Sequence, residues 1–274
     1  MSEQDLTCLD AHFAFGKNWA VYAEKITKDE IEEAVRGLSR LLGGGRLDGS
    51  RVLDIGSGSG LHSLAALRLG AAEVVAVDID LDSVATTRAV LERHAADGHF
   101  SVQTSNVFDL DPATWGTFDI VYSWGVLHHT GDMVRAIRCA ASMVAVDGQF
   151  VFALYRRTWL CSLWKIEKRW YARASASTQL LVRTAYVSFF RLGLWLTGRT
   201  LRQHVSQYRN NRGMDFLHDV HDWLGGFPYE SASPEEVDHL MRQINFREIR
   251  TFTRKRRPFG ILGSGCDEYI YAKN

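Results

Sequence analysis

The chain has 274 residues, of which 46% are hydrophobic and 23% are charged. This composition is typical of a globular protein and excludes intrinsic disorder, while 4 prolines and 23 glycines exclude collagen-like and proline-rich repeats. The 32 basic residues balance 32 acidic ones, yet residues 156–214 hold twelve Lys or Arg against one acid, Glu167. The length predicts one core domain with an insertion, and the insertion is strongly basic.

Residues 1–48 are predicted to form an N-terminal helical cap. Apolar residues recur at helical spacing from Ile31 to Leu42, and the glycines at positions 43–45 end the run. From Arg51 onward the pattern changes to alternating strands and helices. Strands are expected at residues 51–55, 73–78, 100–105, 118–123 and 148–155, with helices at 61–69, 81–94 and 132–144. This alternation predicts an α/β core, residues 49–155, built on a parallel, doubly wound sheet. In such sheets ligands bind at the carboxyl ends of the strands.

The alternation stops after Tyr155. Residues 156–230 are predicted to be an insertion, helical up to residue 213 and then a loop over 214–232, where Gly225, Gly226 and Pro228 break regular structure. A capping Ser233 followed by Pro234 predicts the next helix. Strands are expected at 247–253 and 266–272, so residues 231–274 complete the core.

The cysteines, at positions 8, 139, 161 and 266, are too far apart for a CxxC pair or a zinc knuckle. Scattered cysteines are typical of reduced thiols, and the polar first ten residues do not form a signal peptide. The most apolar stretch, residues 180–196, contains Arg183 and Arg191 and falls short of a membrane span. We therefore expect a cytoplasmic protein without a metal site.

The clearest motif is the glycine loop at residues 52–60 (VLDIGSGSG), which lies between a predicted strand and a predicted helix. Asp78 ends the next strand, at a distance along the chain that suits a carboxylate binding ribose hydroxyls. A dinucleotide would bring its pyrophosphate close to Asp54, which would repel it, and the third glycine comes one position early for GxGxxG. S-adenosylmethionine (SAM) instead carries a cationic sulfonium and an amino group. The charge pattern therefore favours SAM.

Three segments resemble the first, second and fourth motifs of class I SAM-dependent methyltransferases: residues 54–60 (DIGSGSG), 77–80 (VDID) and 118–130 (FDIVYSWGVLHHT). The resemblance covers residues 51–155 well and 233–274 more loosely. It implies a Rossmann-like sheet of seven strands with an antiparallel last strand, and helices before and after the SAM-binding core.

The same resemblance implies that Asp78 holds the ribose hydroxyls and that adenine lies at the end of the third strand. The family's usual Gly-Asp pair at that place is Ser105-Asn106 here, and the Asn106 amide oxygen can still accept a bond from the adenine amino group. The other residues expected to bind SAM are Asn18, Trp19, Asp54, Gly56, Gly58, Gly60, Ile79, Val107 and Trp124. We expect residues 15–19 to fold over SAM, with Trp19 packing rather than stacking on adenine.

Methyl transfer to a hydroxyl or a protonated amine needs a base, and His128 and His129 follow the fourth predicted strand. His129 is the favoured base and His128 the second candidate. Either histidine could instead cap the next helix or pack against Trp124. His218 and Asp222 lie four residues apart and could orient an imidazole, help bind a metal, line the acceptor pocket, or form a solvated helix start.

The insertion is interpreted as a lid that supplies the acceptor pocket. The residues expected to contact the acceptor are Tyr208, Arg212, His218, Asp222 and Trp223. The arginines favour an acceptor with a carboxylate or phosphate, and residues 180–196 could rest on a membrane surface or a lipid-like acceptor. Nucleic acid is not expected, because recognisable binding modules are absent and the net charge is zero.

Four segments outside the core motifs are similar to a branch of small-molecule methyltransferases: residues 15–19, 212–214, 218–230 and 265–268. The predicted function is therefore SAM-dependent methyl transfer to an oxygen or nitrogen of a small molecule. Two alternatives stay open. One is an enzyme that breaks another sulfonium bond, by aminocarboxypropyl transfer or ring closure. The other is a SAM-binding regulator without catalysis.

Overall fold

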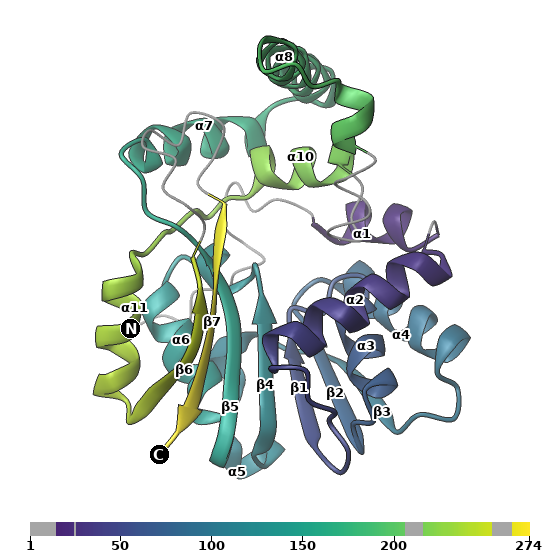
Figure 1. Ribbon diagram of the computed structural model, residues 1–274, viewed down its shortest axis with the longest axis vertical. Helices are drawn as coiled ribbons and strands as arrows, with labels where there is room; N and C mark the ends of the chain where they lie inside the picture. The colour runs from purple at the N-terminus through teal and green to yellow at the C-terminus, as the bar shows by residue number, and fades with distance from the viewer. Residues whose placement is uncertain (1–14, 25, 206–215, 254–264) are drawn as a thin grey trace.

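The computed structural model describes residues 15–24, 26–205, 216–253 and 265–274, apart from the side chains of Lys17, Leu217 and His218. Its centre is a seven-stranded sheet with the strand order β3-β2-β1-β4-β5-β7-β6 (Figure 1). The strands are β1 (Arg51–Ile55), β2 (Glu73–Asp78), β3 (Phe100–Thr104), β4 (Phe118–Trp124), β5 (Val144–Tyr155), β6 (Phe246–Phe252) and β7 (Cys266–Lys273). Strands β1 to β5 pair in parallel, and β7 is antiparallel to both of its neighbours. The predicted doubly wound sheet with an antiparallel last strand is confirmed.

Helices cover both faces of the sheet, and the strands alternate between them. Val52 of β1 packs in the cluster that contains residues of α2 (Lys28–Leu41) and α3 (Leu61–Arg68). The next residue, Leu53, packs on the other face with residues of α6 (Met133–Ser142) and α11 (Pro234–Gln243). Helix α4 (Leu81–His94) and the short elements α5 (Pro112–Trp115), η1 (Val107–Asp109) and η2 (Leu127–His129) complete the core. Burial on both faces explains the nearly continuous apolar runs of the parallel strands.

Helices outside the core lie at the carboxyl ends of the parallel strands (Figure 1). They are α1 (Phe15–Ala23), α7 (Cys161–Arg173), α8 (Ala176–Leu196) and α10 (Phe216–Gly225). Helix α10 lies between α8 and the sheet, and α8 lies at one end of the long axis of the molecule. In the described part of the chain, no helix is both long enough and apolar enough to cross a membrane.

The prediction of a loop over residues 214–232 is wrong for α10, where the chain is helical. Phe216, Val220 and Leu224 recur every four residues and bury their side chains in one cluster with Tyr171 of α7. Tertiary packing of this stripe stabilises the helix, and the glycine-rich breakers end it at Gly225 rather than preventing it. Strand β5 also begins earlier than predicted, because Val144 already pairs with Phe118 before the register shifts.

Candidate active site

The glycine loop connects β1 to α3 and lies beside the end of β2. Gly56 and Gly58 have positive φ angles of 76° and 53°, a conformation that glycine adopts without steric cost. A Cβ atom on Gly56 would lie 2.4 Å from a methyl group of Val126. A Cβ atom on Gly58 would lie 3.2 Å from Nε1 of Trp19, so the indole of α1 lies directly against the loop. Gly60 ends the loop as the residue that precedes α3.

Two carboxylates lie beside this loop on neighbouring strands, of which Asp54 is buried and Asp78 is half-buried. Asp78 accepts a hydrogen bond from the Gly58 N–H through Oδ2 and one from the Asp80 N–H through Oδ1, both at 3.0 Å. Burial raises the pKa of Asp78 to about 6, although the two N–H donors favour the ionised form. Asp54 accepts a hydrogen bond of 2.6 Å from the Ser63 hydroxyl. Burial, to which the charge of Asp78 adds, raises the pKa of Asp54 to about 7.

Neither carboxylate forms an ion pair with a Lys, Arg or His among the described residues. Each therefore loses hydration without gaining an opposite charge, and the two repel each other. A positive charge brought to this place would lower both pKa values and relieve the repulsion. The site has the chemistry to hold a cation, and its backbone N–H groups and carboxylates can hold hydroxyl groups.

The residues expected to surround adenine are partly used by the protein itself. The Asn106 amide oxygen accepts a hydrogen bond of 3.1 Å from the Phe108 N–H and so caps η1. Val107 is buried in the core, and Ile79 directly follows Asp78. The indole N–H of Trp124, at the end of β4, donates to a carboxylate oxygen of Glu268 in β7 at 3.0 Å. Sequence reasoning did not pair Trp124 with Glu268, because 144 positions separate the two residues.

His129 is held in one orientation at the end of β4. Its Nδ1 lies 2.7 Å from the carbonyl oxygen of Pro228, and a carbonyl can only accept, so Nδ1 carries the hydrogen. In the neutral ring, Nε2 is then the unprotonated nitrogen. A Cβ atom on Gly226 would lie 2.6 Å from Cε1 of the imidazole. The centre of the Phe15 ring of α1 lies 5.3 Å from the centre of the imidazole. Backbone and aromatic contacts therefore fix both the tautomer and the position of His129.

His128 is fully buried, and His129 beside it is 9% exposed. Its ring lies 4.0 Å from the ring of Tyr155 and 4.4 Å from that of His129, centre to centre. Burial lowers the pKa of His128 well below its usual value, and the charges of His129 and Lys168 act in the same direction. The imidazole is therefore neutral at physiological pH.

A buried lysine joins α7 to α10 beside this pair. The Lys168 ammonium lies 3.9 Å from the centre of the Trp223 ring and 5.3 Å from that of Tyr229, and it donates to the Trp223 carbonyl oxygen. Such a position over aromatic faces stabilises a cation, while burial lowers the pKa of Lys168. Trp223 also packs edge-on against Trp164 of α7 at 4.5 Å. Sequence reasoning missed Lys168, because it is one of many basic residues in a segment predicted to be solvated.

A hydrogen bond between Asn18 and Asp222 connects α1 to α10. The Asn18 amide N–H donates to Oδ1 of Asp222 at 2.7 Å, and Asp222 is buried. Burial raises the pKa of Asp222, with the charge of Asp219 contributing. The structure thus brings together one residue expected on the SAM side and one expected on the acceptor side.

Three residues expected on the acceptor side are not placed by this geometry. Tyr208 and Arg212 lie outside the described residues, as does the side chain of His218. Among the residues that the structure describes, no group of three or more His, Cys, Asp or Glu could hold a metal ion.

A family model described as a methyltransferase domain matches residues 25–247. The chain is 36% identical over 112 residues to the ubiquinone biosynthesis O-methyltransferase of Xanthomonas campestris pv. campestris, over 41% of this chain and 46% of the relative. It is 30% identical over 132 residues to the ribosomal protein L11 methyltransferase of Ralstonia pickettii, over 44% and 42% respectively. The chain therefore spans less than half the length of these curated relatives.

Solved structures share the fold at low sequence identity. The magnesium protoporphyrin IX methyltransferase of Synechocystis PCC 6803, with bound S-adenosylhomocysteine, has a TM-score of 0.54 and 15% identity, covering 90% of this chain and 84% of that chain. An N-methyltransferase of Bradyrhizobium japonicum WM9, in complex with S-adenosylhomocysteine, has a TM-score of 0.50 and 14% identity, covering 90% and 88%. These similarities show that the seven-stranded sheet with its flanking helices is the class I methyltransferase fold.

Proposed function

Because the chain belongs to the methyltransferase-domain family, we propose that it is an enzyme that transfers a methyl group from SAM to an oxygen or nitrogen of a small molecule. The observation that carries the proposal is the pair of carboxylates beside the glycine loop, the buried Asp54 and the half-buried Asp78, neither of which has a described cationic partner. SAM carries positive charge on its sulfonium and amino groups, which matches this pair. When bound, SAM supplies a methyl group that is already activated for transfer.

The SAM side of the site is formed by β1, β2 and α1. In the proposal, Asp78 accepts hydrogen bonds from the ribose hydroxyls, as its place at the end of β2 favours. Asp54 provides negative charge beneath the glycine loop. The Asn106 amide oxygen has a second lone pair that can accept the adenine amino group while the first caps η1. Trp19 covers the loop at Gly58 and excludes water from that side.

We assign His129 as the base for the acceptor. The Pro228 carbonyl fixes the hydrogen on Nδ1, so Nε2 is the atom that would accept a proton from an acceptor hydroxyl or ammonium. Its position after β4 places it at the end of the sheet where ligands bind in this fold. His128 is assigned a supporting role, because its burial against Tyr155 keeps it neutral and holds its neighbour in place.

We further propose that residues 156–230 form the acceptor side, over the core of 49–155 and 231–274, with residues 1–48 as the cap. The Asn18–Asp222 hydrogen bond and the packing of Phe15 on His129 close α1 against α10 and the end of β4. A site covered by these contacts would suit an acceptor that can be taken out of water, and this supports a small molecule rather than a side chain of a folded protein.

The test is to incubate the chain with methyl-labelled SAM and an extract of its source cells, separated into small-molecule and macromolecular fractions. We expect label in a compound of the small-molecule fraction and S-adenosylhomocysteine in equal amount. The Asp78→Asn and His129→Ala variants should lose most of this label. Label confined to macromolecules would contradict the acceptor class, and methylthioadenosine as the product would show cleavage of another sulfonium bond.

A further inference from the structure

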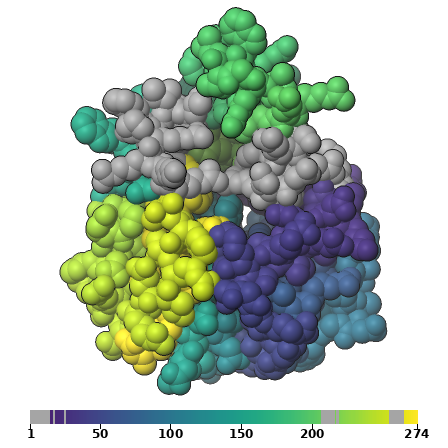
Figure 2. All heavy atoms as spheres, in the orientation of Figure 1, coloured from purple at the N-terminus to yellow at the C-terminus, as the bar shows by residue number. Residues whose placement is uncertain are grey.

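Helix α8 is apolar on both of its long faces. One face packs Val182, Tyr186 and Phe190 in a cluster with residues of α10. The opposite face leaves six large apolar side chains more than half exposed, with Trp195 and Leu196 at 71%: Leu180, Leu181, Phe189, Leu192, Trp195 and Leu196. Figure 2 shows α8 as the protruding end of the molecule, away from the core. An apolar surface of this extent is typical of an interaction site rather than of a face in water.

The polar groups on this face are already satisfied within the helix. The Thr184 hydroxyl donates to the Leu180 carbonyl at 2.7 Å, and the Ser188 hydroxyl donates to the Thr184 carbonyl at 2.8 Å. Hydroxyl groups that bond to the carbonyl four residues earlier do not need water as a partner. Moving this face into apolar surroundings therefore breaks no hydrogen bond of these side chains with the protein.

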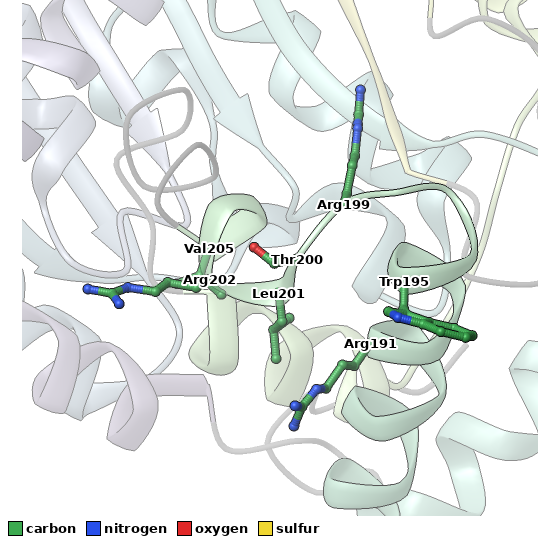
Figure 3. Close-up of a pocket in the computed structure, with 7 residues that line it drawn as sticks. All are labelled: Arg191, Trp195, Arg199, Thr200, Leu201, Arg202 and Val205. Atoms are coloured by element: carbon green, nitrogen blue, oxygen red, sulfur yellow. The ribbon is translucent and has the colours of Figure 1, made fainter.

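A cleft with a mostly apolar lining adjoins the apolar face at the end of α8, and three arginines lie around it with their side chains pointing in different directions (Figure 3). The cleft has a volume of about 510 Å³, and Figure 3 shows Arg191 and Trp195 on α8, with Arg199, Leu201 and Arg202 on the segment that follows. None of these three arginines forms an ion pair with a described residue. Residues 176–205 contain four arginines and no acidic residue. Positive charge next to an apolar face matches the phosphate and acyl groups of an anionic lipid surface.

We propose that α8 and the adjoining arginine cleft bind the surface of a bilayer that contains anionic phospholipid. The outer face of α8 lies at the boundary between headgroups and acyl chains, and Arg191, Arg199 and Arg202 contact lipid phosphates. The helix lies in the plane of the interface. This orientation agrees with the finding that no described helix is long and apolar enough to cross a membrane. A second copy of the chain fits this face less well, because it would bring the same uncompensated arginines against each other. This inference does not depend on the acceptor or on the reaction.

The test measures binding of the full-length chain to vesicles by co-sedimentation, with phosphatidylcholine alone or with a third of phosphatidylglycerol. We expect binding to the anionic vesicles, weakened as salt is raised above about 0.1 M. A variant with Arg191→Gln, Arg199→Gln and Arg202→Gln should bind about 100-fold more weakly, since each basic residue near such a surface contributes roughly five-fold. The control with Arg93→Gln, Arg138→Gln and Arg247→Gln removes the same charge from exposed positions of the core and should bind like the unmodified chain.

The apolar contribution is tested by replacing Phe189, Leu192 and Trp195 with Ser, which should reduce binding ten-fold or more. Its control replaces Leu81 and Val146, two exposed apolar residues far along the chain from α8, with Ser. Circular dichroism melts verify that each variant is folded. Equal binding to neutral and anionic vesicles, or unchanged binding by the α8 variants, would overturn the proposal. A dimer in analytical ultracentrifugation that dissociates in the apolar variant would assign the face to a second copy instead.

Discussion

Replacing Asp78 with Asn tests the assignment of the SAM side with almost no change of shape. In the structure the two carboxylate oxygens each accept one backbone hydrogen bond, from the Gly58 and Asp80 N–H groups. An amide has only one oxygen, so the variant leaves one backbone donor opposite an NH₂ group, and it removes the negative charge. The proposed bonds to the ribose hydroxyls are weakened as well.

Hydrogen bonds to a charged group contribute about 1.5–3 kcal/mol, so Asp78→Asn should raise the Kd for SAM by about 10- to 150-fold. The free energy of unfolding without SAM should change less, because the variant also removes a charge whose burial is unfavourable. Isothermal titration calorimetry gives the Kd, and thermal melts give the stability. Asp82→Asn, an exposed acid at the start of α4, is the matched control and should bind SAM normally.

The pH dependence gives a second measurement on the same residue. The pKa of Asp78 in the folded chain is raised from 3.8 to about 6, so this carboxyl group loses its proton at lower pH in the unfolded chain. The free energy of unfolding therefore falls as pH rises from about 4 to about 6. SAM affinity should change in the opposite direction and rise between about pH 5 and pH 7, because a cation binds the ionised carboxylates of Asp78 and Asp54. Unchanged SAM affinity in Asp78→Asn, or an affinity independent of pH, would refute this reasoning.

Three further variants test the remaining assignments. His129→Ala should lower turnover about 10²- to 10⁴-fold with normal calorimetric SAM binding; loss of SAM binding as the main effect would make the residue structural instead. Asn18→Ala removes the hydrogen bond to the buried Asp222 of α10, so it should raise both the Kd for SAM and the KM for the acceptor about five-fold. If neither value changed, this hydrogen bond would be unimportant for the site. Lys168→Met should raise the melting temperature at pH 7, because burial disfavours the charged lysine. The unmodified chain should become more stable as pH rises above 7, and this gain should be smaller in the variant. A lower melting temperature for Lys168→Met would mean that its contacts with Trp223 outweigh the burial penalty.

The core could be predicted from the sequence because its signals are local. The expected bounds of β1, β2 and α4 agree with the structure to the residue. In α4 the reason is visible: Asp80 caps the helix by accepting hydrogen bonds from the Asp82 and Ser83 N–H groups. A glycine loop between an apolar strand and a helix is equally local, since the steric need for glycine comes from the turn itself.

The contacts of residues 156–230 could not be predicted, because they join residues far apart in the chain. Lys168 and Trp223 are 55 positions apart, and Asn18 and Asp222 are 204 apart. No spacing rule separates a buried lysine from solvated neighbours when its aromatic partners lie on another helix. The same cause explains the loop predicted for α10: its glycines are visible in the sequence, whereas the Tyr171 cluster that buries its apolar stripe is not.

Helix α1 connects the parts of the candidate site that belong to different ends of the chain. Trp19 lies against Gly58 of the glycine loop, Phe15 packs on the imidazole of His129, and Asn18 donates to Asp222 of α10. Its first turn is anchored by the Gly16 N–H, which donates to the Asp80 carboxylate at 3.2 Å. One helix of nine residues therefore contacts the loop, the proposed base and α10. A ligand that stabilises α1 at the glycine loop therefore also stabilises the contacts of α1 with His129 and α10. Under the proposed function, SAM binding at the glycine loop therefore prepares the acceptor side of the site.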